Sequence, residues 1–231
     1  MLLKDKLIQL FGVEWQEALS EYISGKDFYQ LACKISQLRL TKEIYPSREN
    51  VFRCFRETPY NKVKTVLLAM DPYHDGSADG LAFSNSMSKT ISPSLRNILK
   101  EIDDEYPENK ELITHGKLDP QDLSRLAKQG VLLLNSALTV EKGKAGSHLE
   151  LWREFTKKVI ASLQLKNDVI WLFLGKDAGK FSKFIVNPSH IVISAAHPAV
   201  SCYGGTGFFG SGVFKQVNKE LSALNKSEII W

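Results

Sequence analysis

Four residues that could do chemistry each follow an apolar segment, although they lie far apart in the sequence. They are Asp71, Asn135, Gly175 and His197. A carboxylate can orient water, an amide offers both a donor and an acceptor, and an imidazole can act near neutral pH. Glycine lets the backbone approach a ligand closely. Together these groups are typical of a catalytic or binding site.

Each of these side chains also has a purely structural interpretation. Asp71 stands before a proline and could start a turn, Asn135 could cap a strand end, and His197 could bond to nearby backbone. Coincidence at all four segment ends is the less favoured explanation, because one shared site accounts for them together.

The apolar segments before these residues predict four strands. They are continuous rather than alternating, as in strands of a parallel sheet that is covered on both faces, and they comprise residues 66–70, 131–134, 169–174 and 191–196. The carboxyl ends of parallel strands meet at one edge of a sheet, where ligands bind in open α/β folds. We therefore expect the four residues to lie close together.

Helices are predicted between the strands and before the first one. Four polar residues are expected to open helices, by capping or as the start of an amphipathic run: Ser94, Asp119, Ser147 and Asp177. Alternating strands and helices predict a three-layer α/β/α sandwich with a central, mainly parallel four-stranded sheet. We expect one domain over residues 1–231, with a mostly helical part over 1–60 and an α/β catalytic core over 61–225.

The composition favours a folded, soluble protein. Of 231 residues, 43% are hydrophobic and 24% are charged, which argues against disorder. A net charge of +4 permits nucleic-acid binding without requiring it. The three cysteines include no C-x-x-C pair, which argues against a disulfide framework, a zinc site or an iron–sulfur cluster. Early charges and the lack of a long apolar run predict a cytoplasmic location.

Several segments resemble, in order, the motifs of family 1 uracil-DNA glycosylases. Residues 70–84 read M-D-P-Y-H-D-G-S-A-D-G-L-A-F-S, where the family has Q-D-P-Y-H followed by G-L-A-F-S. Residues 127–135, A-K-Q-G-V-L-L-L-N, resemble the family's A-x-Q-G-V-L-L-L-N. His197 and Pro198, followed by G-F-F-G at 207–210, resemble its H-P-S-P-L-S…G-F-F-G segment. Met70 and Lys176 depart from the family's glutamine and serine.

The resemblance implies an enzyme that flips uracil out of DNA and hydrolyses its N-glycosidic bond. The abasic site that remains would initiate base excision repair. Phe83 would stack on the uracil ring, Asn135 would read its edge, and Tyr73 would exclude the methyl group of thymine. The backbone N–H of Met70 would face the uracil O2 atom.

The resemblance also assigns the bond-breaking step. Asp71 would stabilise the cation-like sugar and orient the attacking water, while His197, as a neutral imidazole, would donate to O2 of the departing base. His74 would lie near phosphate or water. The reaction needs neither a metal nor another cofactor.

DNA would be held by loops. Ser92 and Ser94 resemble the end of the family's Pro-rich loop, and Gly175 with Lys176 would meet phosphates. A wedge that supports the opened duplex is expected after His197.

The segment expected to carry the wedge departs most from the family. Val200 is the first candidate wedge and Tyr203 the second, with Ser201 beside them. A smaller wedge predicts a relative preference for single strands.

The predicted partners are uracil-containing DNA in single- and double-stranded form, free uracil as product, and a protein inhibitor of uracil-DNA glycosylases. We expect a monomer without membrane contact. Two alternatives stay open: a catalytically weak scaffold that binds DNA or protein, and an unrelated nucleotide-binding enzyme. The nucleotide-binding alternative is less favoured, because this sequence has no phosphate-binding glycine motif after the first predicted strand.

Overall fold

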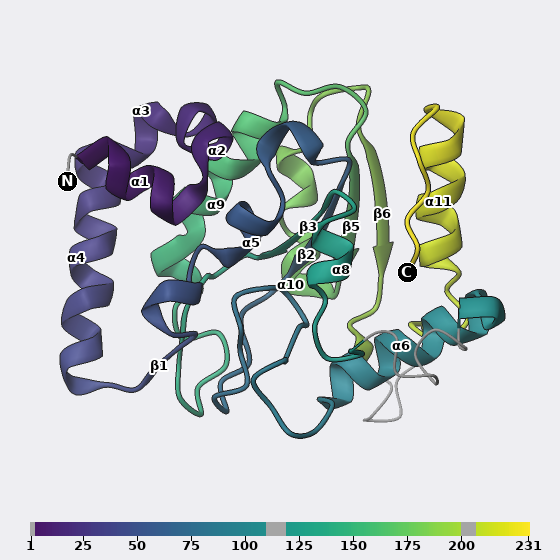
Figure 1. Ribbon diagram of the computed structural model, residues 1–231, viewed down its shortest axis with the longest axis horizontal. Helices are drawn as coiled ribbons and strands as arrows, with labels where there is room; N and C mark the ends of the chain where they lie inside the picture. Colours follow the sequence, from purple (N-terminus) through teal and green to yellow (C-terminus); the bar gives the residue numbers. More distant parts are fainter. Residues whose placement is uncertain (1–2, 110–118, 200–206) are drawn as a thin grey trace.

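A four-stranded parallel sheet forms the centre of the molecule (Figure 1). The computed structural model describes residues 3–109, 119–199 and 207–231. The strands are β2 (Thr65–Ala69), β3 (Val131–Asn135), β5 (Ile170–Leu174) and β6 (Ile191–Ala195), in the order β3-β2-β5-β6. The predicted central sheet is confirmed, and every strand pairing within it is parallel.

The register brings the carboxyl ends of the strands to a common edge. Ala69 lies opposite Asn135, and Leu174 lies opposite Ala195. All residues of β2, β3 and β5 are buried, whereas β6 at the edge of the sheet alternates in exposure. The continuous apolar pattern therefore reflects burial on both faces.

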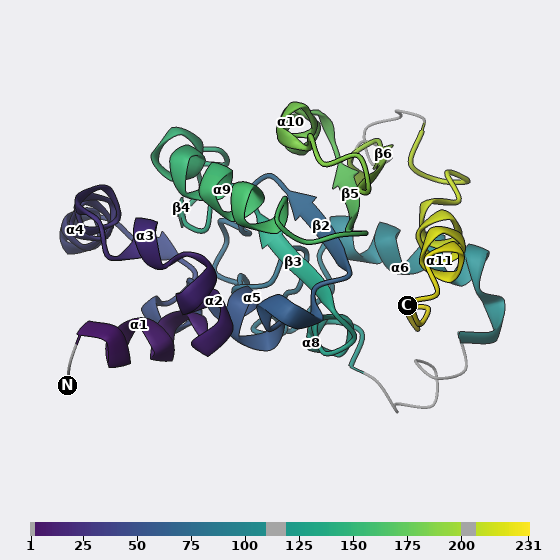
Figure 2. The same ribbon diagram turned by 90° about the horizontal axis from the view of Figure 1, so that it is seen from above.

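Helices cover both faces of the sheet, as Figure 2 shows. On one side lie α9 (Leu149–Leu163) and α10 (Lys176–Gly179), and on the other α6 (Pro93–Glu105) and α11 (Val213–Ala223). The short α5 (Arg53–Glu57) and α8 (Ser124–Ala127) contact β3. The three-layer prediction is confirmed by this arrangement.

The chain before β2 is mostly helical. It contains α1 (Leu3–Phe11), α2 (Val13–Ala18), α3 (Ser20–Ile23) and α4 (Lys26–Thr41), and short 3₁₀ turns at Arg48–Asn50 and Tyr60–Lys62. Strand β1 (Ile44–Tyr45) pairs with β4 (Val140–Glu141) in a separate antiparallel ladder. Further 3₁₀ turns lie at Pro107–Asn109 and Ser182–Phe184.

An aromatic cluster joins this helical segment to the rest of the core. The Phe11 ring lies 4.4 Å from that of Phe52 and 6.1 Å from that of Phe155 on α9, measured between centroids. Phe11 and Phe155 are fully buried. Such burial stabilises each side chain by about 1.5–3 kcal/mol, so the helices are fixed against the sheet layer. The proposed boundary between residues 1–60 and 61–225 stays a prediction.

Two predicted helix caps are wrong because the capping side chains are used elsewhere. Asp119 accepts the N–H of Gln121 at 2.8 Å in a local turn, and α8 begins only at Ser124. Ser147 accepts the N–H of Glu141 at 2.9 Å, so α9 begins after His148 without a side-chain cap.

The other two predicted starts are shifted by one or two residues. Helix α6 is capped by Ser92, whose Oγ accepts the N–H of Leu95 at 3.3 Å, rather than opened at Ser94. The cap of α10 is Gly175, whereas Asp177 lies inside the helix and pairs with Lys180 at 2.5 Å.

Cys33 and Cys54 are free thiols, and Cys202 lies outside the described residues. Within the part of the chain that the structure describes, no helix is long and apolar enough to cross a membrane.

Candidate active site

A cavity of about 280 Å³ lies at the carboxyl edge of the sheet. We call it the site cavity, and its lining is Ala69, Met70, Asp71, Pro72, Tyr73, His74, Ala78, Leu81, Phe83, Ser84, Ser94, Ala145, His197 and Ala199. Both predicted catalytic residues therefore face one space, although 126 positions separate them (197 − 71).

Asp71 follows β2 and is held by a backbone donor. The N–H of Gly146 donates to its Oδ2 at 2.5 Å. Burial raises the pKa of Asp71 above its ordinary value, and the Gly146 hydrogen bond opposes that rise by favouring the carboxylate. The Gly146 N–H thus orients the carboxylate while keeping its charged form accessible.

The segment around Gly146 was not predicted as part of the site. Ala145 lines the site cavity, and the N–H of Gly143 donates to the carbonyl of His74 at 2.9 Å. Gly143 and Gly146 both adopt positive φ angles, 72° and 75°. The sequence signal was a turn with two glycines, but only the fold shows that this turn meets Asp71.

His197 follows β6 by two residues, and its tautomer is set by a local contact. The N–H of Ala199 donates to Nδ1 at 3.1 Å, so Nδ1 is the acceptor and the proton of the neutral ring is on Nε2. Burial lowers the pKa of His197, which favours the neutral ring. A neutral imidazole with its proton on Nε2 can donate a hydrogen bond to a developing anion.

Gly175 makes room for this imidazole. A Cβ at Gly175 would lie 3.0 Å from the Cβ of His197 and 3.1 Å from its Cδ2, and the Gly175 φ of 99° disfavours any side chain. The structure thus places Gly175 directly behind His197, at the start of α10.

Phe83 and Tyr73 form an aromatic wall of the site cavity. Phe83 is buried but has a φ of 63°, a left-handed conformation that is unfavourable for a bulky residue. The Tyr73 hydroxyl donates to the Phe83 carbonyl at 3.1 Å, and the Ser92 hydroxyl donates to Tyr73 Oη at 2.5 Å. Burial raises the pKa of Tyr73, so the phenol stays a donor. The Phe83 and His197 ring centroids are 5.8 Å apart.

Asn135 ends β3, next to the cavity rather than in its lining. It is 5% exposed, and its buried Oδ1 has no hydrogen-bond partner among the described residues. Buried polar atoms of this kind are usually satisfied, so a ligand is a reasonable partner. On the neighbouring strand end, Met70 accepts from the N–H of Ala137 at 3.0 Å and from Ser136 Oγ at 2.6 Å.

The predicted DNA-contacting residues are distributed unevenly. Ser94 is buried and His74 exposed, and both line the site cavity, whereas Ser92 is buried as the cap of α6. Lys176 is exposed at the first position of α10. The three wedge-segment candidates lie outside the described residues: Val200, Ser201 and Tyr203.

The described part of the chain has no cluster of side chains that could bind a metal ion. Residues 3–109, 119–199 and 207–231 contain no group of three or more His, Cys, Asp or Glu side chains placed to hold an ion.

Comparison with known proteins identifies relatives over nearly the whole chain. The family model of the Uracil DNA glycosylase superfamily matches residues 55–222. Uracil-DNA glycosylase 1 of Listeria innocua is 39% identical over 223 residues, covering 94% of this chain and 96% of that protein. Uracil-DNA glycosylase of Buchnera aphidicola is 40% identical over 223 residues, covering 95% and 98%.

Solved structures give the same result for the fold. The crystal structure of mimivirus uracil-DNA glycosylase has a TM-score of 0.82 at 25% identity and covers all of this chain and 89% of that one. A variant of the mimivirus protein in complex with UGI also has a TM-score of 0.82, at 26% identity, covering 100% and 91%.

Proposed function

The chain belongs to the uracil-DNA glycosylase superfamily, and from that premise we propose how its own residues remove uracil from DNA. The reaction hydrolyses the bond between N1 of the base and C1′ of the sugar, and it leaves an abasic site that initiates base excision repair. A base inside a duplex is out of reach, so the uracil must first enter the site cavity.

Uracil is selected by shape and by its hydrogen-bonding edge. Asn135 Oδ1 accepts from N3–H, and Nδ2 donates to O4. Cytosine presents the reversed pattern and would leave buried polar groups unpaired, which costs free energy. Tyr73 fills the space beside C5 and excludes the methyl of thymine. Phe83 stacks on the ring.

Bond cleavage separates charge, and the site has one group for each charge. As the C1′–N1 bond breaks, its electron pair moves onto the base and the sugar becomes cation-like. His197 donates its Nε2 proton in a hydrogen bond to O2 of the uracil anion. Asp71 stabilises the sugar cation and orients the water that attacks C1′. The water loses one proton as the C1′–O bond forms, and this proton balances the uracil anion, so the products are the C1′ hydroxyl and free uracil.

One observation carries this proposal. The carboxylate of Asp71 and the neutral imidazole of His197 line the same cavity as Tyr73 and Phe83. A binding scaffold would have no use for a half-buried carboxylate and a fixed imidazole tautomer around one base-sized space.

The test is an excision assay on matched oligonucleotides that contain one uracil, cytosine or thymine. We expect alkali-labile abasic sites and free uracil from the first oligonucleotide only. DNA binding without any product would favour the scaffold alternative.

DNA grip is proposed to come from residues around the site cavity. His74, Ser94, Gly175 and Lys176 would contact phosphates, and the buried Ser92 would act through Tyr73. Val200, or else Tyr203, would serve as the wedge, with Ser201 beside it. Equal excision from duplex and single-stranded substrates would contradict the proposed weak wedge.

Partners beyond DNA follow from the same premise. We propose free uracil as the product that occupies the site cavity, and a UGI-like protein as an inhibitor, supported by the mimivirus complex. A monomer in the cytoplasm is the proposed working form. Gel filtration of the chain with and without UGI tests the monomer and the complex together.

A further inference from the structure

The strained Phe83 lies in a loop whose two ends meet on a single carboxylate. We call residues 79–86 the Phe83 loop. Asp79 is 1% exposed. Its Oδ1 accepts the N–H of Leu81 at 3.1 Å, and its Oδ2 accepts the Ser84 hydroxyl at 2.6 Å. The N–H and hydroxyl of Ser86 also donate to Oδ2, at 3.2 and 2.6 Å. Asp79 thus binds the chain on both sides of Phe83.

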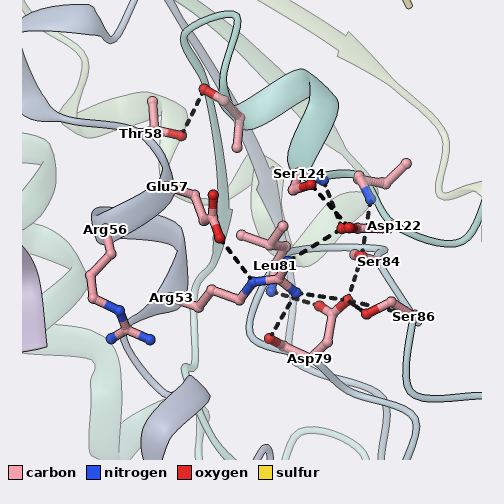
Figure 3. A network of polar contacts seen from close by, with 12 residues as sticks. Arg53, Arg56, Glu57, Thr58, Asp79, Leu81, Ser84, Ser86, Asp122 and Ser124 are labelled. Carbon is pink, nitrogen blue, oxygen red and sulfur yellow. Dashed lines mark hydrogen bonds and ion pairs between the residues drawn. The ribbon is translucent and has the colours of Figure 1, made fainter. Parts of the chain in front are cut away.

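The charge of this buried carboxylate is balanced by Arg53. Nη1 of Arg53 lies 3.1 Å from Asp79 Oδ2 and donates to the Asp79 carbonyl at 3.4 Å. The same guanidinium contacts Asp122 at 3.3 Å and Glu57 at 3.4 Å. Figure 3 shows Arg53 reaching from α5 into this group of carboxylates. Arg53 therefore connects the Phe83 loop to α5 and to the turn before α8.

The loop also lies directly against the chain that carries Arg53. A Cβ at Gly80 would be 2.0 Å from the carbonyl oxygen of Asn50 and 2.9 Å from the Cβ of Arg53. On its inner side, the N–H of Ala82 donates to the carbonyl of Leu133 on β3 at 3.1 Å. The loop is therefore fixed between α5 and the sheet.

We propose that Asp79 and Arg53 are positioning residues for uracil binding, and that they hold the Phe83 ring where it stacks on the base. A left-handed phenylalanine persists only where surrounding contacts over-determine it, and Asp79 accepts hydrogen bonds from both sides of that residue. Neither Asp79 nor Arg53 lines the site cavity, so both act through Phe83. The inference rests on the proposed stacking role of Phe83.

The test compares Asp79→Asn, Arg53→Met and Arg53→Lys with the wild type. Two measurements are made: competitive inhibition by free uracil, and kcat and KM on a short single-stranded oligonucleotide containing uracil. We expect Asp79→Asn and Arg53→Met to raise the uracil inhibition constant and KM about tenfold, close to the loss from one base–aromatic stack. The pH profile of kcat should not move, because Asp71 and His197 are unchanged. Arg53→Lys should recover at least half of the loss.

A matched control separates positioning from general loss of stability. Glu105 is another buried carboxylate; it is the last residue of α6 and accepts the backbone N–H groups of Phe214 and Lys215, which belong to α11 and not to the Phe83 loop. Both carboxyl oxygens of Glu105 accept a backbone N–H, so Glu105→Gln would set its NH2 group against one of these donors and lower the melting temperature, while uracil inhibition should stay at the wild-type value. The inference is overturned if Asp79→Asn and Arg53→Met behave like Glu105→Gln in both measurements. If Asp79→Asn does not fold, the two Arg53 variants decide the outcome.

Phe83→Ala distinguishes this inference from the proposed function. If Asp79 acts through Phe83, adding Asp79→Asn to Phe83→Ala should weaken uracil binding no further. A Phe83→Ala effect without any Asp79 or Arg53 effect would overturn only the positioning role. Unchanged uracil inhibition in Phe83→Ala would overturn the stacking role and, with it, this inference.

Discussion

Asp71 follows β2 and His197 follows β6, and burial shifts the pKa values of these two side chains in opposite directions. It raises the pKa of Asp71 and lowers that of His197, so in both cases the neutral form is favoured. In the proposed mechanism the neutral form of His197 donates to the departing base. The proposed role of Asp71 requires its charged form, which the Gly146 N–H favours against burial. Burial therefore favours the form of the imidazole that the proposed mechanism uses, and it disfavours the form of the carboxylate that the mechanism uses.

This contrast explains why the carboxylate needs a dedicated backbone donor. A hydrogen bond from an N–H group to a carboxylate is charge-assisted and stronger than one to a neutral acceptor. The contact that His197 makes with Ala199 N–H chooses a tautomer and does not have to hold a charge. Removing either side chain should therefore have different consequences.

The largest effect is expected from Asp71→Asn. The amide keeps an acceptor for Gly146 but loses the negative charge, so kcat should fall about 10³-fold, within the usual range for a positioned acid or base. DNA binding should persist. Single-turnover excision with a separate binding assay checks both parts, and near-normal turnover would refute the role of Asp71.

The pH profile sharpens the same prediction. Wild-type kcat/KM should fall as pH drops through the raised pKa of Asp71, because protonation removes the charge. This acid limb should lie at higher pH than an exposed carboxyl group would give. It should be absent from the residual activity of Asp71→Asn.

A smaller loss, about 10²-fold in kcat, is expected from His197→Gln. The amide can still donate to O2 but without the fixed geometry of the imidazole, and losing one oxyanion donor typically costs 10²–10³-fold. The wild-type profile should show no loss of activity on raising the pH through 6–7, because burial lowers the pKa of His197 and a higher pH only increases the neutral fraction of the ring. Such a loss would mean that the imidazolium is the active form.

Gly175→Ala should lower kcat about tenfold, and the change should act through His197 alone. The new Cβ would meet the imidazole at 3.0 Å and displace it, as small misplacements of catalytic groups cost rate. Gly12→Ala is the control, since its φ of 78° carries the same backbone strain but nothing lies within 4 Å of its Cβ. Equal activity in the two variants would show that Gly175 does not position His197.

The strand ends of the site and the loops around it differ in how far the sequence could predict them. Asp71 and His197 follow continuous apolar strands, and parallel strands bring such residues to one edge, so their proximity was predictable. The β3 end with Asn135 was predictable for the same reason. The four-stranded sheet itself was predicted to within one residue at each strand end.

Contacts between loops were not predictable in this way. The turn at Gly146 reaches Asp71 across 75 positions, and Arg53 reaches Asp79 across 26. No periodicity marks such contacts, because they depend on where each loop lies once the sheet has formed. The capping predictions for Ser147 and Asp119 were wrong for a related reason, because a polar side chain before a helix can accept a hydrogen bond within a turn instead of capping the helix.

The smallest effect is expected in the melting temperature, where the contributions of Asp71 and His197 should change with pH in opposite directions. The folded pKa of Asp71 is raised, so its contribution to stability is present at acid pH and is lost as pH rises through that pKa. Asp71→Asn should therefore melt above the wild type at pH 7, and the difference should vanish near pH 3.

The folded pKa of His197 is lowered, so wild-type stability is lost as pH falls through the ordinary imidazole range. His197→Gln should accordingly gain on the wild type between pH 7.5 and 5.5. Partial solvent screening keeps both differences to a few degrees in Tm. Melting curves at several pH values test the pair together: as pH falls, the Tm advantage of Asp71→Asn should shrink and that of His197→Gln should grow, and pH trends in the same direction would contradict the opposite effects of burial on the two pKa values.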